Sequence, residues 1–190
     1  MYLNYKCLKN KTQSFQNYQL TAVQRDHIQL IRKWRNEQKQ VLRQKNAIKS
    51  SEQIKYYENN VWNELNLKYP SKIIMSFLYK DFLIGYGGLV NISWEDKRAE
   101  MSFLLNTSRT HNEIAYSKDM KVFIYLIKLI SFQNLQLNRL YTETFSFRKN
   151  HINVLENCNF NFEGVLVNHN VINGNYVNSI MHASINNERT

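Results

Sequence analysis

Two glutamates, Glu100 and Glu143, lie in β-rich segments and carry side chains that could do acid–base chemistry. A carboxylate can act as a general base, and burial can raise its pKa toward the pH at which it works. For Glu100, in the segment 98–106, the alternative is an exposed and solvated position on a strand. For Glu143 the alternative is a structural ion pair with Arg139 or Arg148.

The histidines and cysteines show no spacing typical of a metal site. Zinc sites combine ligands at short, regular spacings, whereas Cys7 and Cys158 are far apart and the histidines are spread along the chain. We therefore predict no metal. His111, beside the predicted loop, and His182, on the last predicted strand, are the most notable, and we expect each of the two to be an ordinary surface or hydrogen-bonded residue. The histidines are His27, His111, His151, His169 and His182.

The 190-residue chain has a formal net charge of +10. A basic surface attracts anions, including nucleic acids and phosphate-bearing small molecules. The lysines and arginines are scattered, with no arginine-rich tract or nucleic-acid-binding signature, so we expect no nucleic-acid partner. Codon bias of an AT-rich genome accounts for part of the charge, and the rest fits a small polyanionic ligand.

The composition favours one folded domain. Apolar residues make up 43% of the chain, and with one Pro and five Gly no linker divides it. The first residues lack the apolar stretch of a signal peptide. The longest apolar run, Val122 to Ile130, is too short to span a bilayer. We therefore expect a cytoplasmic protein with no membrane span.

Apolar periodicity predicts elements in the order β, α, α, β, β, β, α, β, α, β, β. A three-strand meander followed by a βαβ crossover places helices on both faces of a mixed sheet. Asp26 is the expected N-cap of the first helix and Asn150 that of the last. The expected strands are 16–23, 72–79, 82–92, 98–106, 139–146, 160–168 and 175–185. Of the four expected helices, the first begins at Asp26, the second begins near Ser50, the third spans 116–135 and the fourth spans 150–158.

Three segments together resemble the GNAT superfamily of N-acetyltransferases. They are Ile31–Asn36 (IRKWRN), similar to a "WRN" helix, Ile84–Leu89 (IGYGGL), similar to the third strand, and Asn150–Gly164 (NHINVLENCNFNFEG), similar to the tail "lEk.GF..EG". The resemblance covers residues 16–185. It implies an α+β fold with about seven strands in a mixed, mostly antiparallel sheet, as one acyltransferase domain over 1–190 with 1–14 as an N-terminal extension.

The resemblance implies acetyl-CoA as co-substrate. In the family the pantetheine arm lies beside the fourth strand, and the pyrophosphate lies at the N-terminus of the next helix, where unpaired N–H groups favour an anion. The family's loop motif, Q/R-x-x-G-x-G/A, is matched here by residues 112–117 with Ala115 and Ser117 at glycine positions. The alternative is a non-catalytic binding module whose loop no longer holds the cofactor. The implied cofactor-binding residues are Ser102, Phe103, Leu104, Leu105, Arg109, Asn112, Ala115, Ser117, Lys118 and Asn150.

The resemblance also implies catalytic roles. Glu100 is the implied base that takes a proton from the substrate ammonium, and Glu143 is a second carboxylate that could face the same cleft. The acid tyrosine of many amino-sugar members is replaced by Leu155. Solvent or another hydroxyl, such as that of Tyr141 or Ser146, must then protonate the leaving thiolate.

The implied acceptor is the primary amine of a nucleotide-linked amino sugar, used for surface polysaccharide or glycan. Arg35 and Asn36 could reach this acceptor, and a role in capping the first helix is the alternative. Acetylation of protein N-termini or ribosomal proteins is the other candidate reaction, because that branch also lacks the tyrosine. The sequence leaves open whether the chain forms a homodimer.

Overall fold

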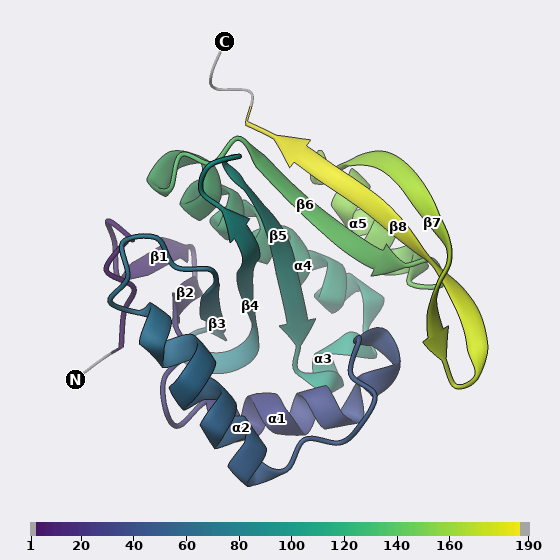
Figure 1. Cartoon of the computed structure of the whole chain (residues 1–190), viewed down its shortest axis with the longest axis horizontal. Helices are drawn as coiled ribbons and strands as arrows, with labels where there is room; N and C mark the ends of the chain where they lie inside the picture. The colour runs from purple at the N-terminus through teal and green to yellow at the C-terminus, as the bar shows by residue number, and fades with distance from the viewer. Residues whose placement is uncertain (1–2, 187–190) are drawn as a thin grey trace.

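The computed structural model describes residues 3–186, which form one mixed sheet flanked by helices (Figure 1). Within these described residues, eight strands follow the order β1-β2-β3-β4-β5-β6-β8-β7, and only the β5–β6 pair is parallel. The strands are β1 Thr12–Phe15, β2 Tyr18–Ala22, β3 Ile73–Tyr79, β4 Phe82–Ser93, β5 Arg98–Leu105, β6 Arg139–Phe145, β7 Asn161–Ile172 and β8 Asn175–Ile185.

Helices cover both faces of this sheet, as the sequence predicted. Figure 1 shows α1 and α2 in front of the sheet and α4 and α5 behind it. Wider π-helical turns extend α2 and α4. The helices are α1 Ile28–Glu37, α2 Ser50–Tyr56, α3 Thr107–Thr110, α4 Glu113–Lys128 and α5 Lys149–Glu156, with helical turns at Lys39–Val41, Tyr57–Val61, Trp62–Glu64 and Leu129–Asn134.

Helix α4 brings aromatic side chains into the centre of the core. The ring of Phe123 is fully buried and lies 4.5 Å from that of Phe103 and 5.5 Å from that of Phe77, measured between centroids. On β4, a Cβ at Gly87 would lie 2.8 Å from the Phe123 ring and 2.1 Å from the carbonyl oxygen of Ser102. Glycine at this position therefore permits the close approach of β4, β5 and α4.

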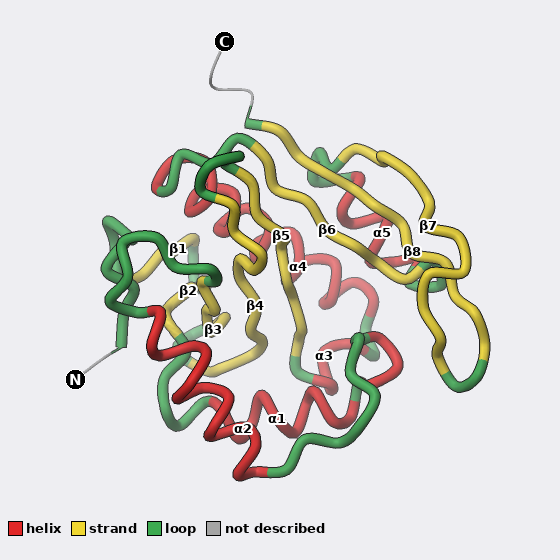
Figure 2. Tube along the Cα trace, in the orientation of Figure 1, coloured by secondary structure: helices red, strands yellow, loops and turns green. Residues whose placement is uncertain are grey.

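Strands β5 and β6 separate inside the sheet. They pair over only three residues, 98–100 with 139–141. Because β5 continues to Leu105 and β6 to Phe145, their facing edges have no strand partner beyond that point. Figure 2 shows the two strands diverging. An opening in the sheet at the carboxyl ends of parallel neighbours is a common place for a ligand.

The N-terminal end of the sheet differs from the prediction. The expected strand 16–23 is Tyr18–Ala22, and β1 precedes it in a hairpin, so residues 12–14 of the expected extension belong to the sheet. This hairpin supplies the eighth strand. The N-cap of α1 is His27 rather than Asp26, whose carboxylate lies 3.8 Å from the His27 ring instead of capping the helix.

The ends of α4 and α5 are also corrected. Helix α4 begins at Glu113, three residues before the expected start, because Oδ1 of Asn112 accepts a hydrogen bond from the Ala115 amide and caps the helix. Helix α5 begins at Lys149 with Arg148 as its N-cap residue. Asn150 therefore lies inside the first turn and does not cap the helix. The short helix α3 lies in what the sequence predicted to be a loop.

Both predicted hairpin turns are present and use left-handed backbone. The φ angles are 50° and 64° at Lys80 and Asp81, and 49° and 80° at Asn173 and Gly174. Positive φ at both central residues matches the twist of antiparallel hairpins. Three further asparagines adopt the same conformation, Asn91, Asn159 and Asn168, with φ of 50°, 57° and 51°.

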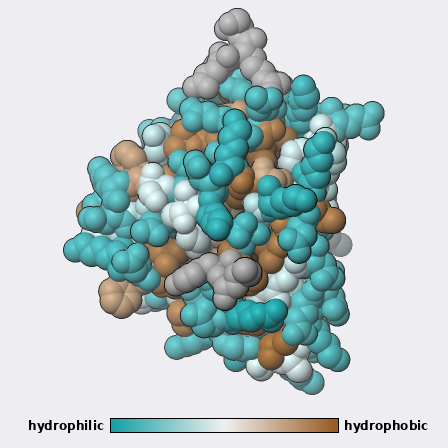
Figure 3. Space-filling model, turned by 90° about the vertical axis from the view of Figure 1, so that its left-hand side faces the viewer, coloured by the Kyte–Doolittle hydropathy of each residue, from teal (hydrophilic) through white to brown (hydrophobic). Residues whose placement is uncertain are grey.

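Figure 3 shows the face around the N-terminal strands, where hydrophilic side chains project outward and hydrophobic ones show between them. Such a mixture is ordinary for a folded domain. Among residues 3–186, no helix combines the length and the apolar character needed to cross a bilayer.

Candidate active site

Two cavities open where β5 and β6 separate. The first has a volume of about 320 Å³ and contains both glutamates identified in the sequence; we call it the carboxylate cavity. The second, of about 510 Å³, lies between the end of β5 and the starts of α4 and α5; we call it the strand-end cavity. Val41, Arg148 and His151 line both cavities, so the two meet at these side chains.

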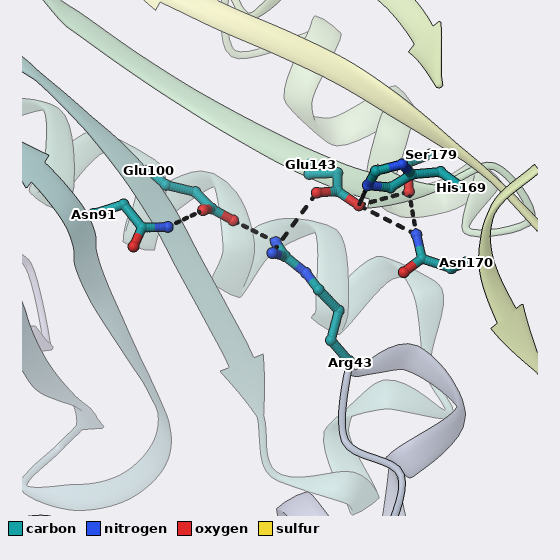
Figure 4. A network of polar contacts seen from close by, with 7 residues as sticks. All are labelled: Arg43, Asn91, Glu100, Glu143, His169, Asn170 and Ser179. Carbon is teal, nitrogen blue, oxygen red and sulfur yellow. Dashed lines mark hydrogen bonds and ion pairs between the residues drawn. The ribbon is translucent and has the colours of Figure 1, made fainter. Parts of the chain in front are cut away.

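Glu100 is buried in the wall of the carboxylate cavity, with 7% of its surface exposed. Nη2 of Arg43 donates to Oε1 at 2.5 Å, and Nδ2 of Asn91 donates to Oε2 at 2.8 Å (Figure 4). Asn91 reaches the carboxylate because the β4–β5 register shifts between Val90 and Ser93, which turns its side chain toward β5. The strand glutamate is therefore buried and fixed, and not a solvated surface residue.

Glu143 lies on the opposite wall and is held by several donors (Figure 4). Its Oε1 accepts hydrogen bonds from Ser179 Oγ at 2.7 Å and Asn170 Nδ2 at 3.3 Å, and lies 3.9 Å from Nε2 of His169. Nη1 of Arg43 is 3.7 Å from Oε2. Burial would raise the pKa of Glu143, but the Ser179 hydrogen bond and the Arg43 charge together hold that pKa below its usual value.

The ion pairs expected for Glu143 are absent among the described residues. Arg139 pairs with Glu163 instead, and Arg148 bonds the hydroxyl of Tyr116. The actual partner is Arg43, which bridges the two glutamates. In the sequence Arg43 is one of many scattered basic residues, and no local pattern marks it as part of the site.

The end of α1 positions the loop that carries Arg43. Oδ1 of Asn36 accepts hydrogen bonds from the Ile48 amide at 2.8 Å and from Gln44 Nε2 at 2.9 Å. Nε of Arg35 donates to Gln44 Oε1 at 3.0 Å. Of the two predicted acceptor-binding residues, Arg35 lines the carboxylate cavity, whereas Asn36 does not and instead holds the loop.

The predicted cofactor strand borders both cavities. Ser102 and Phe103 line the carboxylate cavity, and Leu104 and Leu105 line the strand-end cavity together with Asn150. Beyond its three paired residues, the edge of β5 that faces β6 has no strand partner in the described part of the chain. Such an edge can hydrogen-bond an extended ligand that carries amide groups.

The residues predicted to bind phosphate at the start of α4 line neither cavity. The Ala115 amide bonds the Asn112 side chain at 2.9 Å, so the helix cap already uses it. Oγ of Ser117 donates to Asn150 Oδ1 at 3.2 Å, and Lys118 is exposed. The glycine-poor loop thus satisfies its own polar groups locally.

Arg109, the other predicted phosphate ligand, forms a salt bridge with a buried carboxylate. Its Nε and Nη2 donate to Asp119 at 2.6 Å and 3.1 Å, and the Tyr18 hydroxyl donates to the same carboxylate at 2.9 Å. Asp119 on α4 is fully buried, so its charge depends on these partners from α3 and β2. The basic side chains that do line the strand-end cavity include Arg148 and Lys149.

A buried polar cluster lies at the junction of the two cavities. The Tyr116 hydroxyl is 2.6 Å from Nδ1 of His151, and Nη2 of Arg148 is 3.2 Å from the hydroxyl and 3.3 Å from Nδ1. Burial, with the nearby Arg148 and His182, lowers the pKa of His151 well below its usual value, so the imidazole is neutral. Tyr116 lies in the segment 112–117 and His151 in the segment 150–164, both of which resemble the family, but the sequence singles out neither side chain because their contact joins positions 35 residues apart.

The hydroxyls that the sequence suggested for protonating the thiolate lie outside both cavities. Tyr141 and Ser146 line neither cavity. Leu155, at the position of the family's tyrosine, is fully buried in the core. The only tyrosine hydroxyl bonded to a residue shared by both cavities, within residues 3–186, is that of Tyr116.

Comparisons with known proteins agree with this architecture. A family model described as an acetyltransferase (GNAT) domain matches residues 20–181. The chain belongs to the GNAT acetyltransferase family. A comparison with curated proteins found no match.

Solved GNAT structures have the same fold at low sequence identity. The spermidine N-acetyltransferase of Vibrio cholerae, in complex with CoA and spermine, is 17% identical with a TM-score of 0.76, covering 90% of this chain and 96% of its own. The ribosomal-protein-S5-alanine acetyltransferase of Vibrio fischeri is 16% identical with a TM-score of 0.68, covering 95% of this chain and 100% of its own. These likenesses confirm the predicted fold.

The protein is an acetyl-CoA-dependent N-acetyltransferase. Its geometry fits the co-substrate, because the unpaired edge of β5 borders the strand-end cavity and can bond the amides of a pantetheine arm. Arg148 and Lys149 provide positive charge beside that cavity. Among residues 3–186, no group of three His, Cys, Asp or Glu side chains could hold a metal ion.

Proposed function

We propose that the enzyme acetylates the primary amine of an acceptor that also carries an anionic group, such as a nucleotide-linked amino sugar. The composition of the carboxylate cavity carries this proposal. Glu100 supplies a buried carboxylate for an ammonium, and three arginines, Arg35, Arg43 and Arg148, line the same space. Guanidinium groups bind phosphate and carboxylate with directed pairs of hydrogen bonds.

A basic cavity beyond Arg43 supports an anionic acceptor. It has a volume of about 450 Å³ and shares Arg43 and Phe145 with the carboxylate cavity. Lys39, Lys45 and His169 add basic groups, and its lining within the described chain contains no carboxylate. An acceptor with its amine at Glu100 could extend a diphosphate into this cavity.

The reaction then requires Glu100 to accept the proton of the acceptor ammonium. Acetyl-CoA supplies the acyl group as a thioester. Asn91 holds one carboxylate oxygen, while the other is bonded by Arg43, whose side chain is 52% exposed. An acceptor anion would compete for Arg43 and draw it from Glu100, which frees that oxygen to take the proton.

Polyamine acetylation is the second candidate. The two carboxylates, Glu100 and Glu143, would suit an acceptor with several ammonium groups. The Vibrio cholerae structure was solved with spermine, which favours a test of this class. A polyamine would have to replace Arg43 between the glutamates and would face the basic cavity beyond it.

The test is acetyl transfer to matched acceptors: amino-sugar nucleotides, the same sugars without the nucleotide, spermidine, and an alanine-terminated peptide. We expect the highest kcat/KM for the amino-sugar nucleotides, and a rise in their KM in Arg43→Gln. Preference for spermidine, with faster turnover in Arg43→Gln, would reject the anionic acceptor in favour of a polyamine. Activity on the peptide alone would reject both.

A further inference from the structure

We propose that Tyr116 and His151 together protonate the thiolate that leaves when the thioester is cleaved, with His151 beside the sulfur and Tyr116 supplying its proton through the imidazole. This inference concerns the established acetyl transfer and holds for any amine acceptor. It fills the role left vacant by Leu155, whose apolar side chain is fully buried.

The position of His151 is the first argument. Its side chain lines both the carboxylate cavity and the strand-end cavity, together with Val41 and Arg148. An acyl group that passes from a donor in one cavity to an acceptor in the other must do so where the cavities meet. Of the shared residues, only His151 can donate and accept a proton near neutral pH.

The hydrogen bonds define which ring nitrogen carries the proton. Arg148 has donors only, and its Nη2 lies 3.3 Å from Nδ1 of His151, so Nδ1 must be an acceptor. The same Arg148 nitrogen donates to the Tyr116 oxygen at 3.2 Å, which leaves the Tyr116 hydrogen to point at Nδ1 over 2.6 Å. A neutral imidazole with Nδ1 free of hydrogen carries its proton on Nε2.

The proton transfer balances with these groups alone. When the carbon–sulfur bond breaks, its electron pair goes to sulfur, and the sulfur takes the proton from Nε2. Nδ1 takes the proton from the Tyr116 hydroxyl, so the imidazole stays neutral and changes tautomer. The Arg148 guanidinium stabilises the negative charge of the resulting phenolate, which regains a proton from solvent after CoA leaves.

Burial, aided by the positive charge of Arg148 and by His182, keeps the imidazole neutral before the transfer. The titratable and charged groups around the ring are Arg148, which precedes α5, Tyr116 on α4 and His182 on β8, while Glu100 and Glu143 line the carboxylate cavity. Burial raises the pKa of Tyr116, and the Arg148 charge opposes that rise. Tyr116 therefore remains protonated at neutral pH and available as an acid.

The test compares Tyr116→Phe and His151→Gln with Tyr125→Phe, an exposed tyrosine on the same helix. Tyr116→Phe keeps the ring and removes only the acidic proton. We expect kcat to fall by about 10²-fold or more in both site variants, as for loss of a general acid, with KM for acetyl-CoA changed by less than about threefold. Tyr125→Phe should behave as wild type.

A second measurement needs no acceptor, so it separates failure of this inference from failure of the proposed acceptor. The thiol of CoA bound to the enzyme is titrated by its ultraviolet absorbance. We expect His151→Ala to raise the pKa of the bound thiol, because a donor to the thiolate is lost. An unchanged thiol pKa, wild-type kcat in Tyr116→Phe, or losses confined to KM for acetyl-CoA would overturn the proton relay.

Discussion

Replacing Glu100 by glutamine tests the base assignment with little change of shape. The amide keeps an oxygen for the Asn91 hydrogen bond and fills the same space. Arg43 loses its partner, but its side chain is 52% exposed and Glu143 remains 3.7 Å away. The free energy of unfolding should therefore change by no more than about 1 kcal/mol, the scale of solvent-exposed ion pairs.

The catalytic cost should be much larger. Loss of a general base lowers turnover by about 10²- to 10⁴-fold, equivalent to about 3–5 kcal/mol of transition-state stabilisation. Acetyl-CoA binding should be unaffected, because Glu100 lines the carboxylate cavity and not the strand-end cavity. Urea unfolding, calorimetric titration with CoA and steady-state kinetics measure the three quantities separately.

Glu143→Gln is the matched control, since both carboxylates bind Arg43. Hydrogen bonds and the Arg43 charge lower the pKa of Glu143, which makes it a weak base, so its variant should lose less activity. If Glu100→Gln retained more than a tenth of wild-type kcat, or if the two variants lost activity equally, the assignment of Glu100 as the base would be refuted.

Three further predictions concern stability and pH. Asp119→Ala should lower the free energy of unfolding by about 1–3 kcal/mol, because the buried Tyr18 hydroxyl and the partly exposed Arg109 would both lose their partner. An unchanged urea midpoint would contradict this. Gly88→Ala should lower the free energy of unfolding by about 3 kcal/mol or more, because φ is +138° and a Cβ would lie 2.0 Å from a β3 carbonyl oxygen. The control Gly164→Ala, whose Cβ would have nothing within 4 Å, should change that free energy by less than about 1 kcal/mol, and similar losses in the two variants would refute the strain argument. The folded-state pKa of His151 is lowered, so its contribution to the free energy of unfolding is complete above the unfolded pKa of about 6.5 and is lost as the pH falls below that value. His151→Gln should therefore reduce the acid-side loss of stability by up to about 1.4 kcal/mol per pH unit in urea titrations. An unchanged slope would show that the imidazole is not buried in its neutral form.

Much of the fold could be predicted because its signals are local. The Lys80-Asp81 and Asn173-Gly174 turns, the apolar strands between them and the buried helix through Phe123 follow from short-range patterns. The first strand was missed because Thr12–Phe15 is short and exposed, with no buried alternation. The caps were misjudged because Asn112, Asn150 and Asp26 are equally good capping residues in sequence, and packing decides which of them caps a helix.

The site was only partly predictable for a different reason. Glu100 and the β5 residues could be found because the family resemblance marks that strand. Arg43 and the Tyr116–His151 pair depend on contacts between segments far apart in sequence. The basic charge of Arg109 suggested a phosphate ligand, whereas its pairing with the buried Asp119 depends on packing that the sequence does not reveal.

The left-handed asparagines change how the sequence should be compared with its relatives. In the tail that resembles "lEk.GF..EG", Asn159 stands at the glycine position and has a φ of 57°. Asparagine is the residue that best tolerates this conformation after glycine. Replacement of glycine by asparagine can thus preserve the turn while removing the glycine by which the motif is recognised. In glycine-poor, asparagine-rich proteomes, a motif search that scores the two residues as equivalents at left-handed positions should recover diverged acetyltransferases that an identity-based search overlooks.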